Sequence, residues 1–272
     1  MESFPRVPLN NYNSSKPMKL RLPLAATLLF VMAVSGCATN APKADPLEGL
    51  NRATYAFNDT VDKVVFTPLA EGYQAVTPGF FRIGVTNLFA NIGDVTTSLN
   101  NLLQGKPGHA ASDAGRFVVN STLGILGLFD VATPMGLEKH KEDLGQTLGT
   151  WGVGSGPVLM LPLLGPSSLR DSVSGIEGQF LGYGHYIGHV PTRNSVLGLD
   201  LVNLRANLLG ASSSLDTAAL DKYQFIRDAY LQRRLRNVHD GNVSQEQLDQ
   251  LEEDLEPPRS VAPPKTEPPD KK

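Results

Sequence analysis

The chain has 272 residues, of which 41% are hydrophobic, and a formal net charge of −3 at pH 7. This hydrophobic content is slightly below that of an average globular protein and argues against a polytopic membrane protein. The mildly acidic balance argues against nucleic acid as a partner, and the length suits one large domain or two small ones.

The N-terminus carries the pattern of an export signal. Residues 18–36 read MKLRLPLAATLLFVMAVSG, in which Lys19 and Arg21 precede an apolar run of signal-peptide length. We therefore expect residues 1–36 to be removed. Met18 is an alternative start, because the preceding residues are polar and unlike a leader.

Cys37 directly follows the small residues Ser35-Gly36 and is the only cysteine of the chain. This arrangement resembles the lipobox of bacterial lipoproteins, whose cysteine is acylated, with palmitate among its chains, and becomes the mature N-terminus. An ordinary signal peptide with a chance cysteine would instead leave a free thiol. We expect Cys37 to be a lipid anchor, since two acyl chains already hold a protein stably on a membrane. Ala38, where inner-membrane lipoproteins carry aspartate, favours the outer membrane by the same resemblance, and residues 37–44 form the lipidated N-terminus and a linker.

Amphipathic helices are predicted for most of the mature chain. The first covers residues 45–66, with Asp45 as its N-cap, Pro46 at the first helical position and Glu48 closing a capping box. Its apolar side chains recur at spacings of three and four, while much of the other side is polar.

The next helices are expected from Thr77-Pro78 to Leu103, with an interruption at Gly93, and over about residues 110–123. The segment 124–131 (GILGLFDV) is apolar on nearly all sides, so it is expected to be buried or to face lipid. No convincing alternating strand pattern appears anywhere, and the predicted fold class is all-α.

Residues 144–169 (LGQTLGTWGVGSGPVLMLPLLGPSSL) contain no charged residue but are interrupted by six glycines and three prolines. A transmembrane helix needs about 20 continuous apolar residues, and proline removes helix hydrogen bonds. Bent backbone at membrane depth is tolerated only where protein or a water-filled cavity satisfies its polar groups. The stretch is therefore interpreted as backbone that lines a cavity or lies in a membrane interface, with a buried loop in a soluble core as the alternative.

The C-terminal part is predicted to form three helices, over residues 195–209, 215–238 and 244–255. The first is ended by Gly210, and the last carries a capping box of Ser244 and Gln247. Arginines 227, 233, 234 and 236 are expected on a solvated face, with lipid phosphates or an acidic partner as the alternative. The chain after His239 is acidic and then proline-rich, so we expect its end to be disordered and all of it to be dispensable for the fold.

Catalytic and cofactor motifs are not found. Ser155 stands between glycines in a register that does not make a nucleophile elbow, and no dinucleotide-binding fingerprint or phosphate loop occurs. His185 and His189 are four apart, but the glycines around them argue against a helix and a third metal ligand is not evident. We expect no enzyme activity, no cofactor and no metal.

Several stretches, in order behind the lipobox, are together similar to the MlaA (VacJ) family of outer-membrane lipoproteins. They are residues 45–52 (DPLEGLNR) with 55–58 (YAFN), 101–105 (NLLQG), 115–124 (GRFVVNSTLG), 127–132 (GLFDVA), 144–157, 161–171 and 227–233 (RDAYLQR). Each piece alone is weak, but the ordered set is specific. The match is poor over residues 182–214 and after His239.

The resemblance implies an all-α, ring-like bundle of amphipathic helices around a central channel, embedded in one membrane leaflet. It divides the chain into a signal peptide (1–36), a lipidated linker (37–44), a helical domain (45–239) and an acidic helix with a proline-rich tail (240–272). It implies that phospholipids pass from the outer leaflet of the outer membrane to a periplasmic carrier protein, beside a trimeric porin, which maintains lipid asymmetry.

The bent central stretch and the resemblance together suggest channel or lipid-contact residues. These candidates are Phe57, Asn58, Phe129, Trp151, Gly152, Gly154, Gly156, Pro157, Leu159 and Leu161. Two other functions stay open: a structural lipoprotein that only scaffolds a porin, and a membrane-tethered lipid hydrolase.

Overall fold

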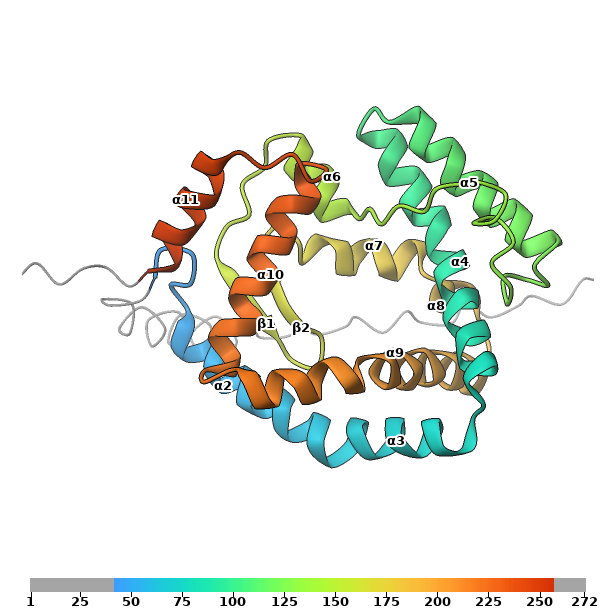
Figure 1. The fold of residues 1–272 in the computed structure, drawn as a ribbon, viewed down its shortest axis with the longest axis horizontal. Coiled ribbons are helices and arrows are strands. Elements are labelled where there is room, and N and C mark those ends of the chain that lie inside the picture. Colours follow the sequence, from blue (N-terminus) through green and yellow to red (C-terminus); the bar gives the residue numbers. More distant parts are fainter. Residues whose placement is uncertain (1–41, 257–272) are drawn as a thin grey trace, which may run out of the picture.

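The computed structural model describes residues 42–256 and arranges their helices as a ring, which confirms the predicted helical fold (Figure 1). The predicted signal peptide, Cys37 and the proline-rich end lie outside the described residues. The elements are α2 (Glu48–Val61), the π-helix η1 (Asp62–Phe66), α3 (Thr67–Val76), α4 (Gly79–Leu103), α5 (Pro107–Thr122), α6 (Leu144–Thr150), β1 (Val158–Leu161), β2 (Gly165–Ser168), α7 (Val173–Leu181), α8 (Tyr183–Tyr186), α9 (Val190–Ala218), α10 (Lys222–Val238) and α11 (Gln245–Leu255). Within residues 42–256, none of the helices combines the length and the apolar character needed to cross a membrane.

The first side of the ring is a nearly continuous rod of α2, η1 and α3 (Figure 1). The predicted capping role of Asp45 is wrong, because the N-cap is Leu47 and has no side-chain cap. Asp45 is instead fully buried and accepts hydrogen bonds from the Asn51 amide (2.8 Å) and the Tyr223 hydroxyl (2.5 Å). A buried carboxylate needs such donors, and here it ties the start of α2 to α10.

The second side is the helical hairpin of α4 and α5, which pack along each other (Figure 1). The predicted interruption at Gly93 is wrong, since α4 continues through it without a break. The hairpin turns at Gly105, whose φ of +75° favours glycine. The buried Arg116 of α5 makes two hydrogen bonds of 2.8 and 2.9 Å to Asp130 and so holds the loop after α5.

The central stretch contains an element that the sequence did not predict, a short antiparallel hairpin of β1 and β2. Its register pairs Val158 with Ser168 and Leu161 with Gly165. The buried Asn51 side chain donates to the Val158 carbonyl (3.0 Å) and accepts from the Met160 N–H (2.8 Å). Strand β1 is thereby fixed against α2, and the hairpin lies on the inner side of the ring (Figure 1).

The helix boundaries in the last part of the ring differ from the prediction. The helix expected over residues 215–238 is two helices, because α9 continues to Ala218 and α10 begins after Asp221, whose side chain caps the Gln224 N–H. The capping box of Ser244 and Gln247 in α11 is confirmed.

Helix α11 packs on the body of the protein, contrary to the expectation that the chain after His239 has little to bury. Leu251 and Leu255 contact the cluster of Val158, Tyr230 and Leu231. The Ala44 N–H donates to the Asp254 carbonyl (2.9 Å), and the Ala44 carbonyl accepts from the Val158 N–H (3.0 Å). The chain on the mature side of the predicted anchor is thus held between β1 and α11.

Two of the four arginines expected on a solvated face of α10 are buried, so that prediction is wrong for Arg227 and Arg234. Arg234 binds Asp143 through two hydrogen bonds of 2.6 and 3.0 Å and Asp171 at 2.8 Å. Burial alone would raise the pKa of Asp143, but hydrogen bonds and charge from Arg234 lower it to about 2. These pairs join α10 to the start of α6 and to the loop before α7.

Candidate functional site

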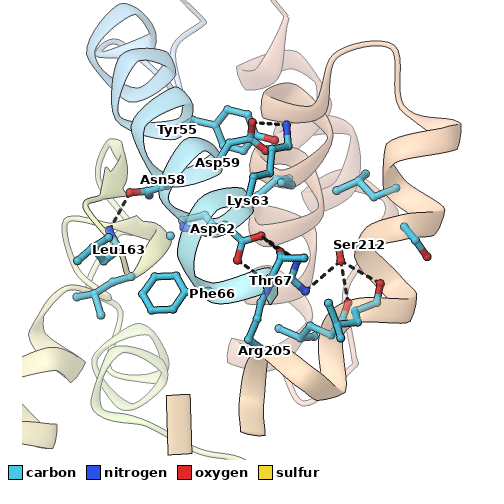
Figure 2. A pocket seen from close by; sticks show the side chains of 18 of the residues that line it. Tyr55, Asn58, Asp59, Asp62, Lys63, Phe66, Thr67, Leu163, Arg205 and Ser212 are labelled. Carbon is cyan, nitrogen blue, oxygen red and sulfur yellow. Dashed lines mark hydrogen bonds and ion pairs between the residues drawn. The ribbon is translucent and has the colours of Figure 1, made fainter. Parts of the chain in front are cut away.

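A cavity of about 830 Å³ lies between the rod of α2, η1 and α3, the tip of the β-hairpin and the second half of α9 (Figure 2). Its lining is partly apolar and partly charged. The lining residues are Tyr55, Asn58, Asp59, Asp62, Lys63, Phe66, Thr67, Glu71, Gln74, Met160, Leu163, Leu164, Gly165, Pro166, Arg205, Leu208, Leu209, Gly210, Ser212, Ser213, Leu215 and Ile226.

The polar wall is organised by a bidentate pair between Asp62 and Arg205 (Figure 2). The Arg205 Nε donates to Asp62 Oδ1 at 2.6 Å and its Nη2 donates to Oδ2 at 2.8 Å. The same guanidinium also donates to the hydroxyls of Ser212 (3.1 Å) and Thr67 (3.0 Å). A fork-to-fork pair fixes both side chains more firmly than a single ion contact.

The π-helix η1 explains why Asp62 and Thr67 share this wall. The Thr67 N–H donates to the Asp62 carbonyl, five residues back, where an α-helix would use a partner four residues back. Such π turns are rare overall, but many of those that occur lie at functional sites. The Thr67 hydroxyl also donates to the Asp62 carboxylate (3.1 Å), so both ends of η1 face Arg205.

Further charges lie along the same wall. The Lys63 ammonium contacts the Asp59 carboxylate at 2.6 Å, one helical turn earlier. On α3, Thr67, Glu71 and Gln74 follow at spacings of four and three, so they occupy one face of the helix, and all three line the cavity.

The hairpin tip forms the apolar wall and is held by Asn58 (Figure 2). The Asn58 amide donates to the Leu161 carbonyl (2.9 Å), and its oxygen accepts from the Leu163 N–H (2.8 Å). Leu163 has a φ of +65°, a conformation that is uncommon for a branched side chain. Leu163 and its neighbour Leu164 are exposed, and both line the cavity.

A family model described as MlaA lipoprotein matches residues 43–237. The chain belongs to the MlaA lipoprotein family. The family match ends at the last turn of α10, and α11 lies outside the matched residues.

Relatives and a solved structure agree with membership of the MlaA family. The chain is 33% identical over 224 residues to the Escherichia coli (strain K12) intermembrane phospholipid transport system lipoprotein MlaA, covering 79% of this chain and 88% of the relative. It is 37% identical over 195 residues to an uncharacterised protein of Rickettsia bellii, covering 71% and 76%. It also matches a solved structure described as the structural basis for maintenance of bacterial outer membrane lipid asymmetry, with a TM-score of 0.63 and 31% identity, covering 71% of this chain and 98% of that one.

The candidate residues taken from the MlaA resemblance fall in three places. Asn58 lines the cavity, Phe57 beside it is about half exposed, and Leu159 and Leu161 flank the lining residue Met160 in β1. The other members of the set lie elsewhere.

The loop between α6 and β1 holds most of the remaining candidates, none of which lines this cavity. Gly152 and Gly156 adopt φ values of +90° and +67°, whereas Gly154 has no positive φ. The Trp151 indole donates to the Leu103 carbonyl at 3.1 Å, which attaches this loop to the end of α4. Pro157 immediately precedes β1.

Phe129 lies in the loop after α5, with its ring exposed. Phe129 is not among the residues that line the cavity, so this loop is not part of the candidate site.

Sequence reasoning missed the central residues of the cavity. Arg205 and Asp62 are 143 positions apart, so no local pattern could pair them. The polar side of the first predicted helix, which contains Asp59 and Asp62, was the one available signal, and it was not assigned to a site.

Proposed function

We propose that this MlaA-family chain passes phospholipids out of the outer leaflet of the outer membrane and so maintains lipid asymmetry. The E. coli relative is named as an intermembrane phospholipid transport lipoprotein, and the matched structure concerns outer-membrane lipid asymmetry. The observation that carries the proposal is the cavity, because it offers both surfaces that a phospholipid needs.

The two walls suit the two ends of a lipid. Acyl chains can contact Phe66, the hairpin leucines 163 and 164, and leucines 208 and 209 of α9. Each methylene kept out of water contributes about 0.8 kcal/mol, so an apolar wall lowers the cost of moving a chain through a periplasmic opening. The headgroup can follow the polar wall beside Asp62 and Arg205. The sequence carries no nucleotide-binding motif, and in our proposal the protein only lowers a barrier, without enzyme activity.

Exposed apolar side chains support the embedding of the protein in one membrane leaflet. Large apolar side chains are exposed along α3 and the start of α4, among them Val76 and Phe80 with about four fifths of their surface accessible. A soluble monomer rarely exposes contiguous apolar patches of this kind. We propose that these side chains contact acyl chains of the inner leaflet of the outer membrane.

Three partners complete the proposal: a lipid anchor on Cys37, a trimeric porin beside the ring, and a periplasmic carrier that receives the lipid. They rest on the lipobox and on the family resemblance. Cys37→Ala should abolish acylation and normal processing, and mass spectrometry of the mature wild-type protein should find a modified cysteine.

The route through the cavity can be tested by filling it. Ser213 is exposed and lines the cavity, so Ser213→Trp should obstruct lipid while leaving the fold intact. In a strain that lacks the native gene, this variant should leave surface phospholipid as high as the deletion does, at normal protein level. Ser195→Trp, the same change at an exposed position of α9 outside the cavity lining, should restore asymmetry.

Other outcomes would favour the rival functions. Full asymmetry with a well-expressed Ser213→Trp protein would remove the cavity from the route, and retained porin binding with no cavity effect would favour a scaffold. Release of fatty acid or headgroup from phospholipid by the purified protein would favour a hydrolase.

A further inference from the structure

The charges that line the cavity do not balance. Three carboxylates, from Asp59, Asp62 and Glu71, face two cations, from Lys63 and Arg205. Both cations are already paired, Lys63 with Asp59 at 2.6 Å and Arg205 with Asp62 at 2.6 and 2.8 Å. The cavity wall therefore carries one negative charge in excess.

That excess charge belongs to Glu71. Its side chain is exposed on α3, on the face that carries the lining residues Thr67 and Gln74. It makes no hydrogen bond or ion pair with any of the residues described between 42 and 256, whereas Asp59 and Asp62 each have a cationic partner. Glu71 is thus the carboxylate available to a ligand.

Among the described lining residues, the ion pairs of the cavity leave a carboxylate but no cation available to a ligand, so the two common classes of phospholipid headgroup should bind differently. A headgroup with net negative charge finds no free cation, and to reach Arg205 it would have to displace the bidentate Asp62. A headgroup that ends in a primary ammonium brings three N–H donors and can contact Glu71 without breaking any existing pair. Opposite charges within about 4–6 Å attract, while the same carboxylate repels an anionic headgroup.

We propose that Glu71 makes the cavity select phospholipids whose headgroup ends in a primary ammonium, of the ethanolamine type, over anionic phospholipids of the glycerol type. The selection rests on the proposed function, since it needs a lipid in this cavity. The Asp62–Arg205 pair has a second role here, because Asp62 occupies the guanidinium and keeps it from binding an anionic headgroup.

The experiment is a direct competition on the full-length, lipidated protein in neutral detergent. Soluble dihexanoyl phospholipids with ethanolamine and glycerol headgroups are added at equal concentration, and bound lipid is counted by native mass spectrometry. An exposed carboxylate–ammonium contact should favour the ethanolamine lipid by about twofold to fivefold. The preference should shrink as salt is raised, because exposed charges are screened.

Variants of Glu71 give the decisive readout. Glu71→Gln should bind both lipids equally, and Glu71→Lys should prefer the glycerol lipid. Glu246→Gln removes the same charge from α11, outside the cavity lining, and should keep the wild-type preference. Equal binding of both lipids by the wild type, or a preference that survives Glu71→Gln, would overturn the selection.

Ser213→Trp separates this inference from the function on which it rests. If the cavity holds lipid, this variant should lose binding of both headgroups. Wild-type binding without selectivity, lost in Ser213→Trp, overturns the role of Glu71 alone. Binding that Ser213→Trp leaves unchanged means that lipid lies elsewhere, which overturns the route and the selection together.

Discussion

Helices α9 and α10 follow each other in the chain but differ in the kind of side chain that they bury and expose. On α10 the inward stripe is Tyr223, Arg227, Tyr230 and Arg234, and all four side chains are buried. On α9 the leucines at 197, 199, 201, 204 and 208 are 39–55% exposed. Charge is buried on one helix and apolar surface is displayed on the other.

This contrast extends over the whole of the described chain. Within residues 42–256, the buried side chains are more often polar or charged than apolar, while many large apolar side chains are exposed. A protein in water gains most from burying apolar surface. The α10 region is therefore held largely by paired charges and hydrogen bonds, whereas the α9 region leaves apolar side chains exposed, which our proposal assigns to contact with lipid.

Breaking the α10 network should give the largest effect on stability. Arg234→Met leaves the carboxylates of Asp143 and Asp171 without their shared cation, and removing one partner of a buried ion pair costs about 3–5 kcal/mol. Denaturant unfolding in detergent measures the loss. Arg233→Met, at the exposed neighbouring position, should change the free energy of unfolding by less than about 0.5 kcal/mol; similar losses in both variants would contradict a buried network.

The second largest effect on stability is expected at low pH, which should weaken the ion pair between Asp143 and Arg234. The pKa of Asp143 is lowered from 3.8 to about 2 in the folded protein, so its charged form stabilises the fold above about pH 4. That contribution is lost as the pH falls from about 4 to 2, and it amounts to about 2 kcal/mol by linkage. Unfolding measured over this range should show a steep loss in the wild type and a shallower one in Asp143→Asn. Parallel curves would show that Asp143 is not responsible.

Removal of α11 tests how much its packing against α10 and β1 contributes to stability. Leu251 and Leu255 are half buried against Tyr230 and Leu231, which corresponds to about 1–2 kcal/mol of hydrophobic stabilisation. Truncation after Asn242 should lower the melting temperature by roughly 2–8 °C. Truncation after Glu256, which keeps α11, should leave the melting temperature unchanged. An equal melting temperature for both truncated proteins would mean that α11 contributes nothing.

The smallest effect on stability is expected from a substitution in the glycine-rich stretch of residues 144–169. Comparing two of its glycines shows which part of the stretch packs against α10. A Cβ on Gly154 would meet nothing within 4 Å, so Gly154→Leu should change stability by less than about 0.5 kcal/mol. A Cβ on Gly145 would lie 2.6 Å from Asp171 Oδ1 and 2.7 Å from Arg234 Nη2, so even Gly145→Ala should destabilise. If Gly154 borders the lipid route, Gly154→Leu should also raise surface phospholipid; unchanged asymmetry would exclude this loop from the route.

The order and type of the helices could be predicted from the sequence because they depend on local periodicity and on capping residues such as Ser244. The burial of Arg227 and Arg234 could not, since arginine in a helix is usually solvated. One signal was available: both arginines share a stripe with Tyr223 and Tyr230, at spacings of four, three and four, and an aromatic stripe indicates an inward face.

The cavity was harder to predict than the helices because its walls come from distant segments. Asn58 was selected through the family resemblance, but its partners in the hairpin lie more than 100 positions away. The π turn at Asp62 shifts the register of the rod by about one residue. The first predicted helix ends at Phe66, whereas the rod continues through α3 to Val76, so Thr67 and Glu71 were not placed on any helix face.

The backbone of Ala44 links the N-terminal tether to α11 and to β1. Only residues 38–43 lie between the proposed anchor at Cys37 and Ala44, so the membrane attachment lies within about 25 Å of Ala44. A pull along this short tether acts first on Pro42, whose carbonyl accepts from the Asp45 N–H, and on Lys43, which pairs with Glu253 of α11 at 2.9 Å. It then acts on the two backbone hydrogen bonds that join Ala44 to Asp254 of α11 and to Val158 of β1. Because β1 continues into the hairpin tip that forms one wall of the cavity, tension on the proposed anchor would reach that wall, and α11 would share the load.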